Sequence, residues 1–283
     1  MFERLEEALR PEISRFSGRV SLALQSFEDS STYALNANDR MHAASLIKLP
    51  ILIEALAQVQ QGQLSLTSRH SLQREDIVGG SGVLNALSPG LSLSLQDLLT
   101  LMIIVSDNTA TNMVIDRVGI EAVNQRCETI GLQRTELIGK LQLLPEHYNE
   151  RQRAGERNVS CAADMLKLLS SLQRGVLLSD QMTEVALRIL RKQVYTEALG
   201  RYLPLDSELH EDAVRLGCKS GNIRGVWHDV GIIYSLSNKP LYAIAVMTAD
   251  AQDLSESWEQ EGMMLIARVS RMVFEEVQAQ REA

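Results

Sequence analysis

The segment that decides the fold runs Ala43-Ala44-Ser45-Leu46-Ile47-Lys48-Leu49-Pro50 and continues as Ile51-Leu52-Ile53-Glu54-Ala55-Leu56-Ala57. From Leu46 to Ala57 nearly every side chain is apolar, and no turn residue interrupts the run before Gly62. A helix that is apolar on all sides belongs in the interior of a protein. We therefore expect a buried central helix that ends near Gly62, with the other elements packed around it.

Two polar residues, Ser45 and Lys48, stand at the entrance of this helix. Burying a lysine ammonium is costly unless it is paired. Residues three apart share one helical face, so Lys48 can reach the Ser45 hydroxyl. A desolvated lysine is one base that can turn a serine into a nucleophile. The same four residues also fit a helix cap followed by a lysine that extends to solvent, so the rest of the chain must decide.

The composition is that of an ordinary globular protein. The chain has 283 residues, 45% hydrophobic and 23% charged, enough for one large domain or two interleaved subdomains. Its net charge of -8 argues against a general nucleic-acid binder. Cys127, Cys161 and Cys218 have no metal-ligand spacing and fit free thiols in a reducing compartment. The histidines are scattered singly, so no zinc site is expected.

The N-terminal segment predicts an acidic, amphipathic helix over residues 2–16. It has neither the basic start nor the apolar run of a secretory signal, and no stretch of the chain is long enough to span a bilayer. As it stands, the sequence predicts a cytoplasmic protein that binds no membrane, or an extracytoplasmic one if a leader precedes this start.

The order of the elements predicts an α+β fold. Alternating residues predict a hairpin over 18–27 and 32–36, and three strands over 214–221, 226–234 and 241–247. Helices are expected over 95–105, 109–118, 120–131, 162–178, 180–192 and 256–278. Hairpin connections favour an antiparallel five-stranded sheet from both chain ends, flanked by the terminal helices. The sheet part covers about 1–42 and 195–283, and 43–194 forms an inserted all-helical subdomain of the same domain.

Two local segments have structural interpretations. The glycine-rich stretch from Ile77 to Leu84 lacks the Gly-Lys-Ser/Thr ending of a phosphate-binding loop, and Val83 breaks the Gly-x-Ser-x-Gly pattern. We expect a loop that enters a short helix. Ser94-Leu95-Gln96-Asp97 is typical of a capping box that begins the next helix.

Three polar motifs interrupt apolar segments in a fixed order: Ser45-x-x-Lys48, Ser106-Asp107-Asn108 and Lys219-Ser220-Gly221. Their order resembles the class A β-lactamases, which belong to the penicillin-recognising serine hydrolases of the β-lactamase/DD-peptidase superfamily. The likeness extends to Gly80-Ser81-Gly82 and to His228-Asp229-Val230-Gly231, and it covers essentially the whole chain.

The resemblance implies a role for each motif residue. Ser45 would form the acyl-enzyme, Lys48 would help to deprotonate it, and Ser106 would pass the proton to the leaving nitrogen. Asn108 would bind the side-chain amide of the substrate. Substrate binding would also involve Lys219 and Ser220, which would hold the substrate carboxylate, together with Gly221 and Asn222. Gly221 would let the strand approach closely, and the N–H groups of Ser45 and Asn222 would form the oxyanion hole.

The resemblance also implies the ligands. The substrate would be a small β-lactam or a peptidoglycan-like molecule, with no metal or organic cofactor and no nucleic-acid partner. The oligomeric state is left open.

One loop departs from the family pattern. Class A enzymes activate the deacylating water with a Glu that lies four residues before an Asn. Here the nearest match is Glu146 with Asn149, a spacing of three. Asn158 stands where the family usually has an acid that closes the loop by an ion pair. Glu146 is therefore either a displaced catalytic base or a surface carboxylate, with Glu150 and Glu156 as the next candidates.

These features favour a serine hydrolase that is acylated at Ser45 and deacylates slowly. Two alternatives remain open at this point. One is a peptidase or esterase acting on D-Ala-D-Ala-like or small ester substrates. The other is a penicillin-binding receptor that is acylated without turnover.

Overall fold

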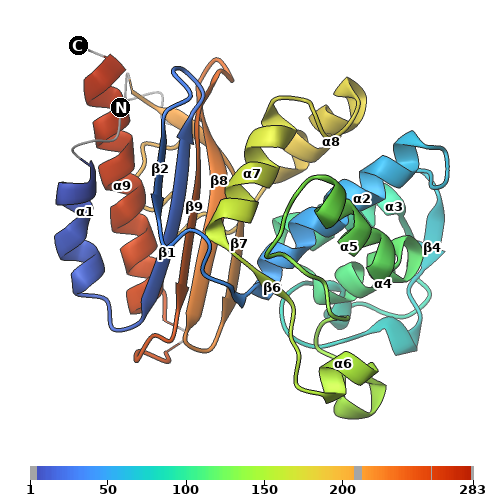
Figure 1. Ribbon diagram of the computed structural model, residues 1–283. Coiled ribbons are helices and arrows are strands. Elements are labelled where there is room, and N and C mark those ends of the chain that lie inside the picture. The colour runs from blue at the N-terminus through green and yellow to red at the C-terminus, as the bar shows by residue number, and fades with distance from the viewer. Residues whose placement is uncertain (1–4, 207–211, 256, 282–283) are drawn as a thin grey trace. The chain divides into compact units, whose positions relative to one another are not determined.

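The computed structural model describes residues 5–206, 212–255 and 257–281, and it divides the chain into two compact units (Figure 1). The first unit takes Met1–Leu46, Ser160–Ser170 and Tyr195–Ala283, and the second takes Ile47–Val159 and Ser171–Val194. The first unit thus combines both ends of the chain. Residues 160–170 group with it, whereas the sequence analysis placed them in the helical part.

The first unit is built on a five-stranded sheet with the order β2-β1-β9-β8-β7. Its strands are β1 (Arg19–Ser26), β2 (Thr32–Leu35), β7 (Val214–Ile223), β8 (Val226–Ser235) and β9 (Pro240–Ala249). All neighbouring strands are antiparallel, and the central strand β9 pairs with β1 from the other end of the chain. The α+β class and the five-stranded antiparallel sheet are confirmed.

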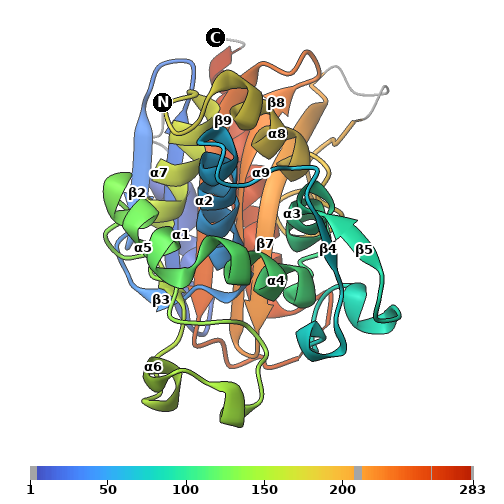
Figure 2. The same ribbon diagram turned by 90° about the vertical axis from the view of Figure 1, so that its right-hand side faces the viewer.

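The terminal helices α1 (Leu5–Ser14) and α9 (Glu261–Arg281) lie side by side on one face of this sheet (Figures 1 and 2). Their apolar faces share a core with the strands, and fully burying one such side chain stabilises the fold by about 1.5–3 kcal/mol. The core includes Leu5, Leu9, Leu22, Leu24, Ile244, Val246, Leu265, Val269 and Val273. The first predicted helix is confirmed from Leu5 onward. Residues 2–4, and Glu256 at the predicted start of α9, lie outside the described residues.

The second unit is organised around α2 (Lys48–Gln60), whose first eleven residues, 48–58, are all buried. It contacts four other helices (Figure 2), α3 (Leu95–Ile104), α4 (Asn108–Val118), α5 (Ile120–Thr129) and α8 (Asp180–Leu190). Pro50 is tolerated in the first turn, where a backbone N–H has no helical partner. The prediction of a buried central helix is confirmed.

Several short elements escaped the sequence analysis because two to four residues are too few to show a period. The helical part is not purely helical, since β4 (Arg69–Ser71) and β5 (Ser92–Ser94) form a small hairpin. The other short elements are β3 (Met41–His42), η1 (Ala44–Ile47), η2 (Arg74–Asp76), η4 (Pro145–His147), α6 (Glu150–Arg153) and β6 (Val159–Ser160). The short helix that was expected after the glycine-rich stretch is η3 (Leu84–Ala86). The remaining helix is α7 (Ala162–Gln173). None of the described helices is long and apolar enough to cross a membrane.

The predicted capping box at the start of α3 is present. The Ser94 hydroxyl accepts a hydrogen bond from the Asp97 N–H at 3.1 Å, and the Asp97 carboxylate accepts one from the Ser94 N–H at 2.9 Å. This reciprocal pair satisfies two backbone donors that the first turn of a helix leaves open. It fixes where α3 begins, and therefore where the chain reaches Ser106 after the helix ends.

Candidate active site

Lys48 is the first residue of α2, and its side chain is fully buried. Its Nζ donates hydrogen bonds to the carbonyl oxygen of Ser106 at 2.6 Å, to the Ser106 Oγ at 3.0 Å and to the Asn108 Oδ1 at 2.8 Å. Three oxygens match the three donors of an ammonium, which offsets the cost of burying it. The second unit thus brings three predicted site residues into one hydrogen-bonded cluster.

Ser106 is held in a backbone conformation that serine seldom adopts. Its φ is +54°, in the left-handed region, which costs of order 1–2 kcal/mol for a residue with a Cβ. The next residue supplies the restraint. The Asp107 N–H donates to the Leu101 carbonyl at 3.1 Å, and the Asp107 Oδ1 caps α4 by accepting from the Ala110 N–H at 2.8 Å. Such strain persists where the surroundings over-determine it, as they do here.

The glycine-rich loop 79–82 lies against this turn. The Asp107 Oδ2 accepts from the N–H groups of Val83 and Leu84 at 2.7 and 2.8 Å, and a Cβ on Gly82 would overlap the Asp107 carboxylate. A Cβ on Gly80 would lie 2.6 Å from the Asn108 Nδ2. The loop then enters η3, as the sequence analysis expected. The glycines therefore serve close packing against the Ser106 turn.

In the first unit, a buried histidine supports the backbone that leads to Ser45. The His228 Nε2 lies 2.8 Å from the carbonyl oxygen of His42. Burial lowers the pKa of His228 to about 4, so the ring is neutral at pH 7 and donates from Nε2. The Ala44 N–H donates to the His42 Nδ1 at 2.9 Å, and Ala44 has a φ of +45°. These contacts fix the turn directly before Ser45, which lies in η1, three residues ahead of Lys48.

The strand β7 carries the third motif past this turn. A Cβ on Gly221 would lie 2.8 Å from the Ser45 nitrogen and 3.2 Å from the Ala44 Cβ, so the strand can pass this close only with glycine here. Ser220 precedes Gly221 and is partly exposed, and Asn222 follows it with an exposed side chain. Within the first unit, the structure therefore brings Gly221 against Ser45. The oxyanion role of the Ser45 and Asn222 N–H groups stays a prediction.

Lys219 is the second fully buried lysine of the described chain. Its Nζ donates to the Ser220 carbonyl at 2.6 Å, and burial lowers its pKa to about 8, so most of it is still charged at pH 7. Asp229 on β8 lies opposite Ser220 in the strand register and is also buried, which raises its pKa. The Asp229 Oδ2 accepts from the Leu199 N–H at 3.0 Å. The first unit thus carries a buried cation beside the strand end that approaches Ser45.

The loop that contains Glu146 presents this residue differently. Glu146 lies in η4 with an exposed side chain, and in the described part of the chain no hydrogen bond joins it to Lys48 or Asn108. Its predicted partner Asn149 caps α6, because its Oδ1 accepts from the Gln152 N–H at 2.8 Å. The Asn149 Nδ2 donates to the Ile138 carbonyl at 2.7 Å. Both polar atoms of the Asn149 side chain therefore form hydrogen bonds to the backbone of the loop.

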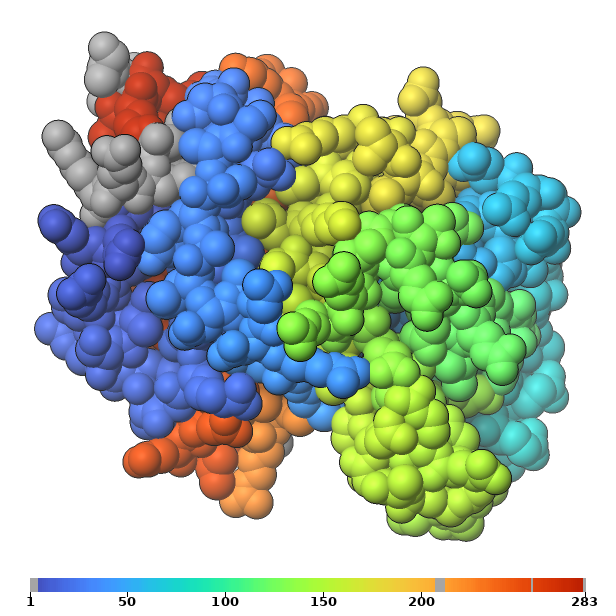
Figure 3. All heavy atoms as spheres, in the orientation of Figure 1, coloured from blue at the N-terminus to red at the C-terminus, as the bar shows by residue number. Residues whose placement is uncertain are grey.

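Asn158 closes this loop without an ion pair. The Asn158 Oδ1 accepts from the N–H groups of Ile138 and Gly139 at 2.7 and 3.1 Å, and its Nδ2 donates to the Gly139 carbonyl at 3.1 Å. The backbones of Glu136 and Val159 exchange two further hydrogen bonds. One buried carboxamide therefore makes three contacts to the opposite side of the loop, at the position where the family pattern has an ion pair. The segment around α6 still protrudes from the surface of the second unit (Figure 3).

The sequence analysis missed the residue that joins this loop to α4. The Asn112 Oδ1 accepts from the Leu141 N–H at 2.9 Å, and the Asn112 Nδ2 donates to the Leu141 carbonyl at 2.8 Å. Asn112 follows Asn108 by four residues, so both side chains lie on one helical face. That spacing was the signal in the sequence, and it brings residues 141–142 next to the Lys48 cluster.

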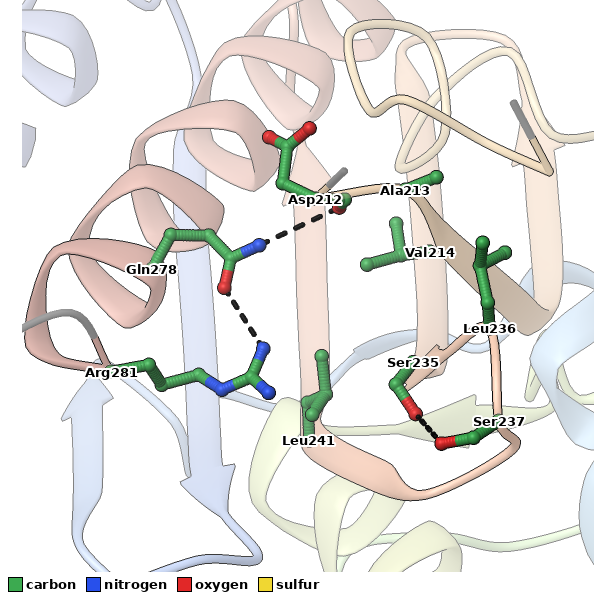
Figure 4. Close-up of a pocket in the computed structure, with 9 residues that line it drawn as sticks. All are labelled: Asp212, Ala213, Val214, Ser235, Leu236, Ser237, Leu241, Gln278 and Arg281. Carbon is green, nitrogen blue, oxygen red and sulfur yellow. Dashed lines mark hydrogen bonds between the residues drawn. The ribbon is translucent and has the colours of Figure 1, made fainter. Parts of the chain in front are cut away.

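Each unit of the described chain contains a hollow. The first, of about 560 Å³ in the first unit, lies between the start of β7, the β8–β9 turn and the end of α9 (Figure 4). Its polar groups bond to one another: Arg281 donates to Gln278 at 3.0 Å and Ser235 lies 2.8 Å from Ser237. The second, of about 530 Å³ in the second unit, is bordered by Glu75, Ile120 and loop residues 140–152. Neither is lined by a predicted catalytic or substrate-binding residue, although Asn149, the predicted partner of Glu146, lines the second.

The family model described as the β-lactamase enzyme family matches residues 4–277. The chain belongs to this family. A relative, β-lactamase BRO-1 of Moraxella catarrhalis, is 22% identical over 96% of this chain and 83% of its own length. A solved structure of a β-lactamase from Sphaerobacter thermophilus superposes with a TM-score of 0.84 and 30% identity, covering 99% of this chain and 98% of that one.

A further similar structure is a mutant of PBP-A, described as an acyl-enzyme complex with penicillin G. It superposes with a TM-score of 0.81 and 26% identity, covering 99% of this chain and 97% of that one. The structural neighbours also include ancestral class A β-lactamases, at 25% identity. The resemblance drawn from the three motifs is therefore confirmed, and the chain is a hydrolase of the serine β-lactamase type.

Proposed function

We propose that this protein is acylated at Ser45 by β-lactams and releases the acyl group slowly. Ser45 attacks the lactam carbonyl and the C–N bond of the ring breaks; Lys48 takes the Ser45 proton while in its neutral amine form, and Ser106 relays a proton from Lys48 to the nitrogen of the opened ring. Lys219 and Ser220 bind the substrate carboxylate. The observation that carries the proposal is the Lys48 cluster, because a buried lysine hydrogen-bonded to a serine at 3.0 Å provides a path for that proton.

Slow release follows from the loop. Hydrolysis of the acyl-enzyme needs a group that takes a proton from water, and general-base catalysis contributes typically 10²–10⁴-fold. Glu146 is exposed, and the Asn149 amide is committed to bonds within the loop. Both observations support a loop that provides weak activation of water. We therefore expect a burst of acylation followed by low turnover.

The experiment is intact-protein mass spectrometry during incubation with penicillin G. The wild type should gain the mass of one penicillin within the burst and keep it through later time points. Ser45→Ala should remain unlabelled while its circular dichroism is unchanged, because only one hydroxyl is removed. The exposed Ser88→Ala is the matched control and should be labelled like the wild type. Labelling of the Ser45→Ala variant would overturn the assignment of the nucleophile.

A second candidate function is a peptidase of the D-Ala-D-Ala type, or a penicillin-binding receptor. Its support is the similarity to PBP-A, a mutant of which is described as an acyl-enzyme complex with penicillin G. The two candidates differ in the preferred acyl donor. A peptide ending in D-Ala-D-Ala that is cleaved repeatedly, while penicillin labels once and stays, would favour the peptidase. Repeated hydrolysis of penicillin without peptide cleavage would favour the β-lactamase.

A further inference from the structure

Asp229 is a buried carboxylic acid that no step of the proposed reaction uses. It lies on β8 and has no exposed surface, and its Oδ1 has no hydrogen-bond partner within the described chain. A buried carboxylate with an unsatisfied oxygen is costly to the fold. Such groups gather at functional sites, which makes Asp229 a candidate for a role beyond packing.

The peptide of Leu199 holds the Asp229 carboxylate in one orientation. The Leu199 N–H donates to the Asp229 Oδ2 at 3.0 Å, and the Leu199 carbonyl accepts from the buried Ser270 hydroxyl of α9 at 2.7 Å. All three residues belong to the first unit. The fold itself therefore fixes the position of this carboxylate, with no contribution from a substrate.

Lys219 lies beside Asp229 on the neighbouring strand. In the register of β7 and β8, Ser220 is directly opposite Asp229, and Lys219 is one residue away from that pair. The Lys219 Nζ bends back to the Ser220 carbonyl at 2.6 Å, so the ammonium lies next to the peptide that faces Asp229. Paired strands are only about 4.8 Å apart. The two buried ionisable groups are therefore close neighbours across one strand pair.

The other titratable groups near this pair are few. Cys218, on the same face of β7 as Ser220, is a neutral thiol because burial raises its pKa well above the ordinary value. His228 precedes Asp229 on β8 and is neutral because burial lowers its pKa to about 4. Glu197 acts on Cys218 and is partly exposed. Burial raises the pKa of Asp229 to about 7, and within the described chain Lys219 is the cation whose charge opposes this rise.

We propose that Asp229 is a positioning residue that keeps the Lys219 ammonium charged until a substrate carboxylate binds to it. Burial favours the neutral amine of Lys219, whereas a fixed anion across the strand pair favours the ammonium. The inference rests on the proposed binding of the substrate carboxylate by Lys219, and it adds a residue that acts only through Lys219. Since Asp229 is ionised above about pH 7, it acts in the pH range where Lys219 would otherwise lose its proton.

The first test measures the titration of Lys219 directly. NMR of isotope-labelled lysine side chains gives the midpoint, with the Lys219 signal assigned by its loss in Lys219→Arg. Asp229→Asn removes the charge but keeps an acceptor for the Leu199 N–H. Its midpoint should lie about one pH unit below that of the wild type, the lower end of the range for a nearby opposite charge. Asp229→Ser, a second neutral variant, should give the same shift. An unchanged or higher midpoint in the neutral variants would overturn the inference.

The second test measures acylation by penicillin G. At pH 8 Asp229→Asn should be acylated about fivefold more slowly than the wild type, and at pH 6 almost equally fast, because a shift of one unit changes the charged fraction only near the midpoint. The neutral methyl ester of penicillin G should show no difference at either pH. An equal loss at both pH values and with both substrates would mean that Asp229 only supports the fold, and would overturn the inference.

Ser270→Ala is the matched control for a purely structural effect. It removes the hydroxyl that holds Leu199 but leaves the Asp229 charge in place. Its free energy of unfolding should fall, while the Lys219 midpoint and the pH profile of acylation should match those of the wild type. Absence of acylation in the wild type would instead reject the proposed function, and the NMR midpoint would still decide whether Asp229 acts on Lys219.

Discussion

The Lys48 cluster and the tip of the loop around Glu146 belong to the same unit, yet they are built in opposite ways. Lys48 is fully buried and gives three hydrogen bonds to Ser106 and Asn108. Glu146 is exposed and lies in a single 3₁₀ turn. In this unit, the residues that we propose for acylation are thus held by hydrogen bonds before a substrate arrives, whereas Glu146, the residue considered for deacylation, is not. Preorganised groups contribute most to catalysis, so the two half-reactions should differ in rate.

Removing the centre of the cluster should have the largest effect. Lys48→Met keeps much of the buried stem but leaves the oxygens of Ser106 and Asn108 without their cation. Acylation by penicillin G should fall by about 10²–10⁴-fold, the range of general-base catalysis. The measurement is the rate of label incorporation, with circular dichroism as the fold check. Lys192→Met, at an exposed lysine, should acylate at the wild-type rate. A loss under threefold in Lys48→Met would place the base elsewhere.

The closure of the loop can be tested by stability. Asn158→Ala leaves the buried N–H groups of Ile138 and Gly139 without an acceptor, which should lower the free energy of unfolding by about 2–3 kcal/mol. Urea denaturation measures this loss. Asn158→Asp keeps both acceptor contacts and should lose less, and Gln133→Ala on the surface should lose almost nothing. Similar stability of Asn158→Ala and the surface control would show that the loop is closed by other contacts.

Which parts could be predicted from the sequence depends on the length scale of the signal. The all-apolar run from Leu46 to Ala57 and the alternating strands extend over many residues, so their periods identify the central helix and the sheet. Two of the three motifs marked Lys48, Ser106 and Asn108, which the structure joins in one cluster. By contrast, the spacing of Asn112 from Asn108 shows only that both side chains lie on one face of α4. Its contact with Leu141 depends on the path of an irregular loop, which has no period to follow.

His228 is a second example of a residue whose contact could not be predicted from a local sequence pattern. The sequence placed it in a strand of the family type and excluded a zinc site, but its hydrogen bond to His42 spans 186 residues. No local pattern marks such a contact, because the register of two distant segments decides it. The exposure of Glu146 is equally invisible in the sequence, where the spacing to Asn149 left a catalytic base and a surface carboxylate as equal alternatives.

The pH dependence of acylation should distinguish a role of Lys219 in substrate binding from a role in the stability of the fold. Because burial lowers the pKa of Lys219 to about 8, its ammonium is present below that pH and lost above it. Acylation by a carboxylate-bearing penam should therefore fall about tenfold per pH unit above 8, and acylation by its neutral methyl ester should not. The unfolded chain keeps the lysine protonated to higher pH than the folded protein does, so the contribution of this group to the free energy of unfolding rises as the pH increases from 8 to 10.5. A fall shared by both substrates would mean that Lys219 does not bind the carboxylate.

The smallest effect is expected for a substitution of Glu146. This prediction is also the most direct test of the difference between the Lys48 cluster and the tip of the loop. Glu146→Gln removes a charge from a side chain that is solvent-exposed and has no hydrogen bond to the Lys48 cluster within the described chain. Surface substitutions of this kind usually change stability by less than about 0.5 kcal/mol. The lifetime of the penicilloyl-enzyme, followed by mass spectrometry after removal of free penicillin, should stay within about twofold of the wild type. Glu128→Gln, at an exposed glutamate of α5 that is not a candidate base, is the matched control and should behave alike. If Glu146→Gln instead lengthens the lifetime by the 10²-fold typical of a lost general base, the loop tip must move to the acylated serine during the reaction. The exposed position would then be a resting state, and Glu146 would be the displaced base that its spacing to Asn149 suggested.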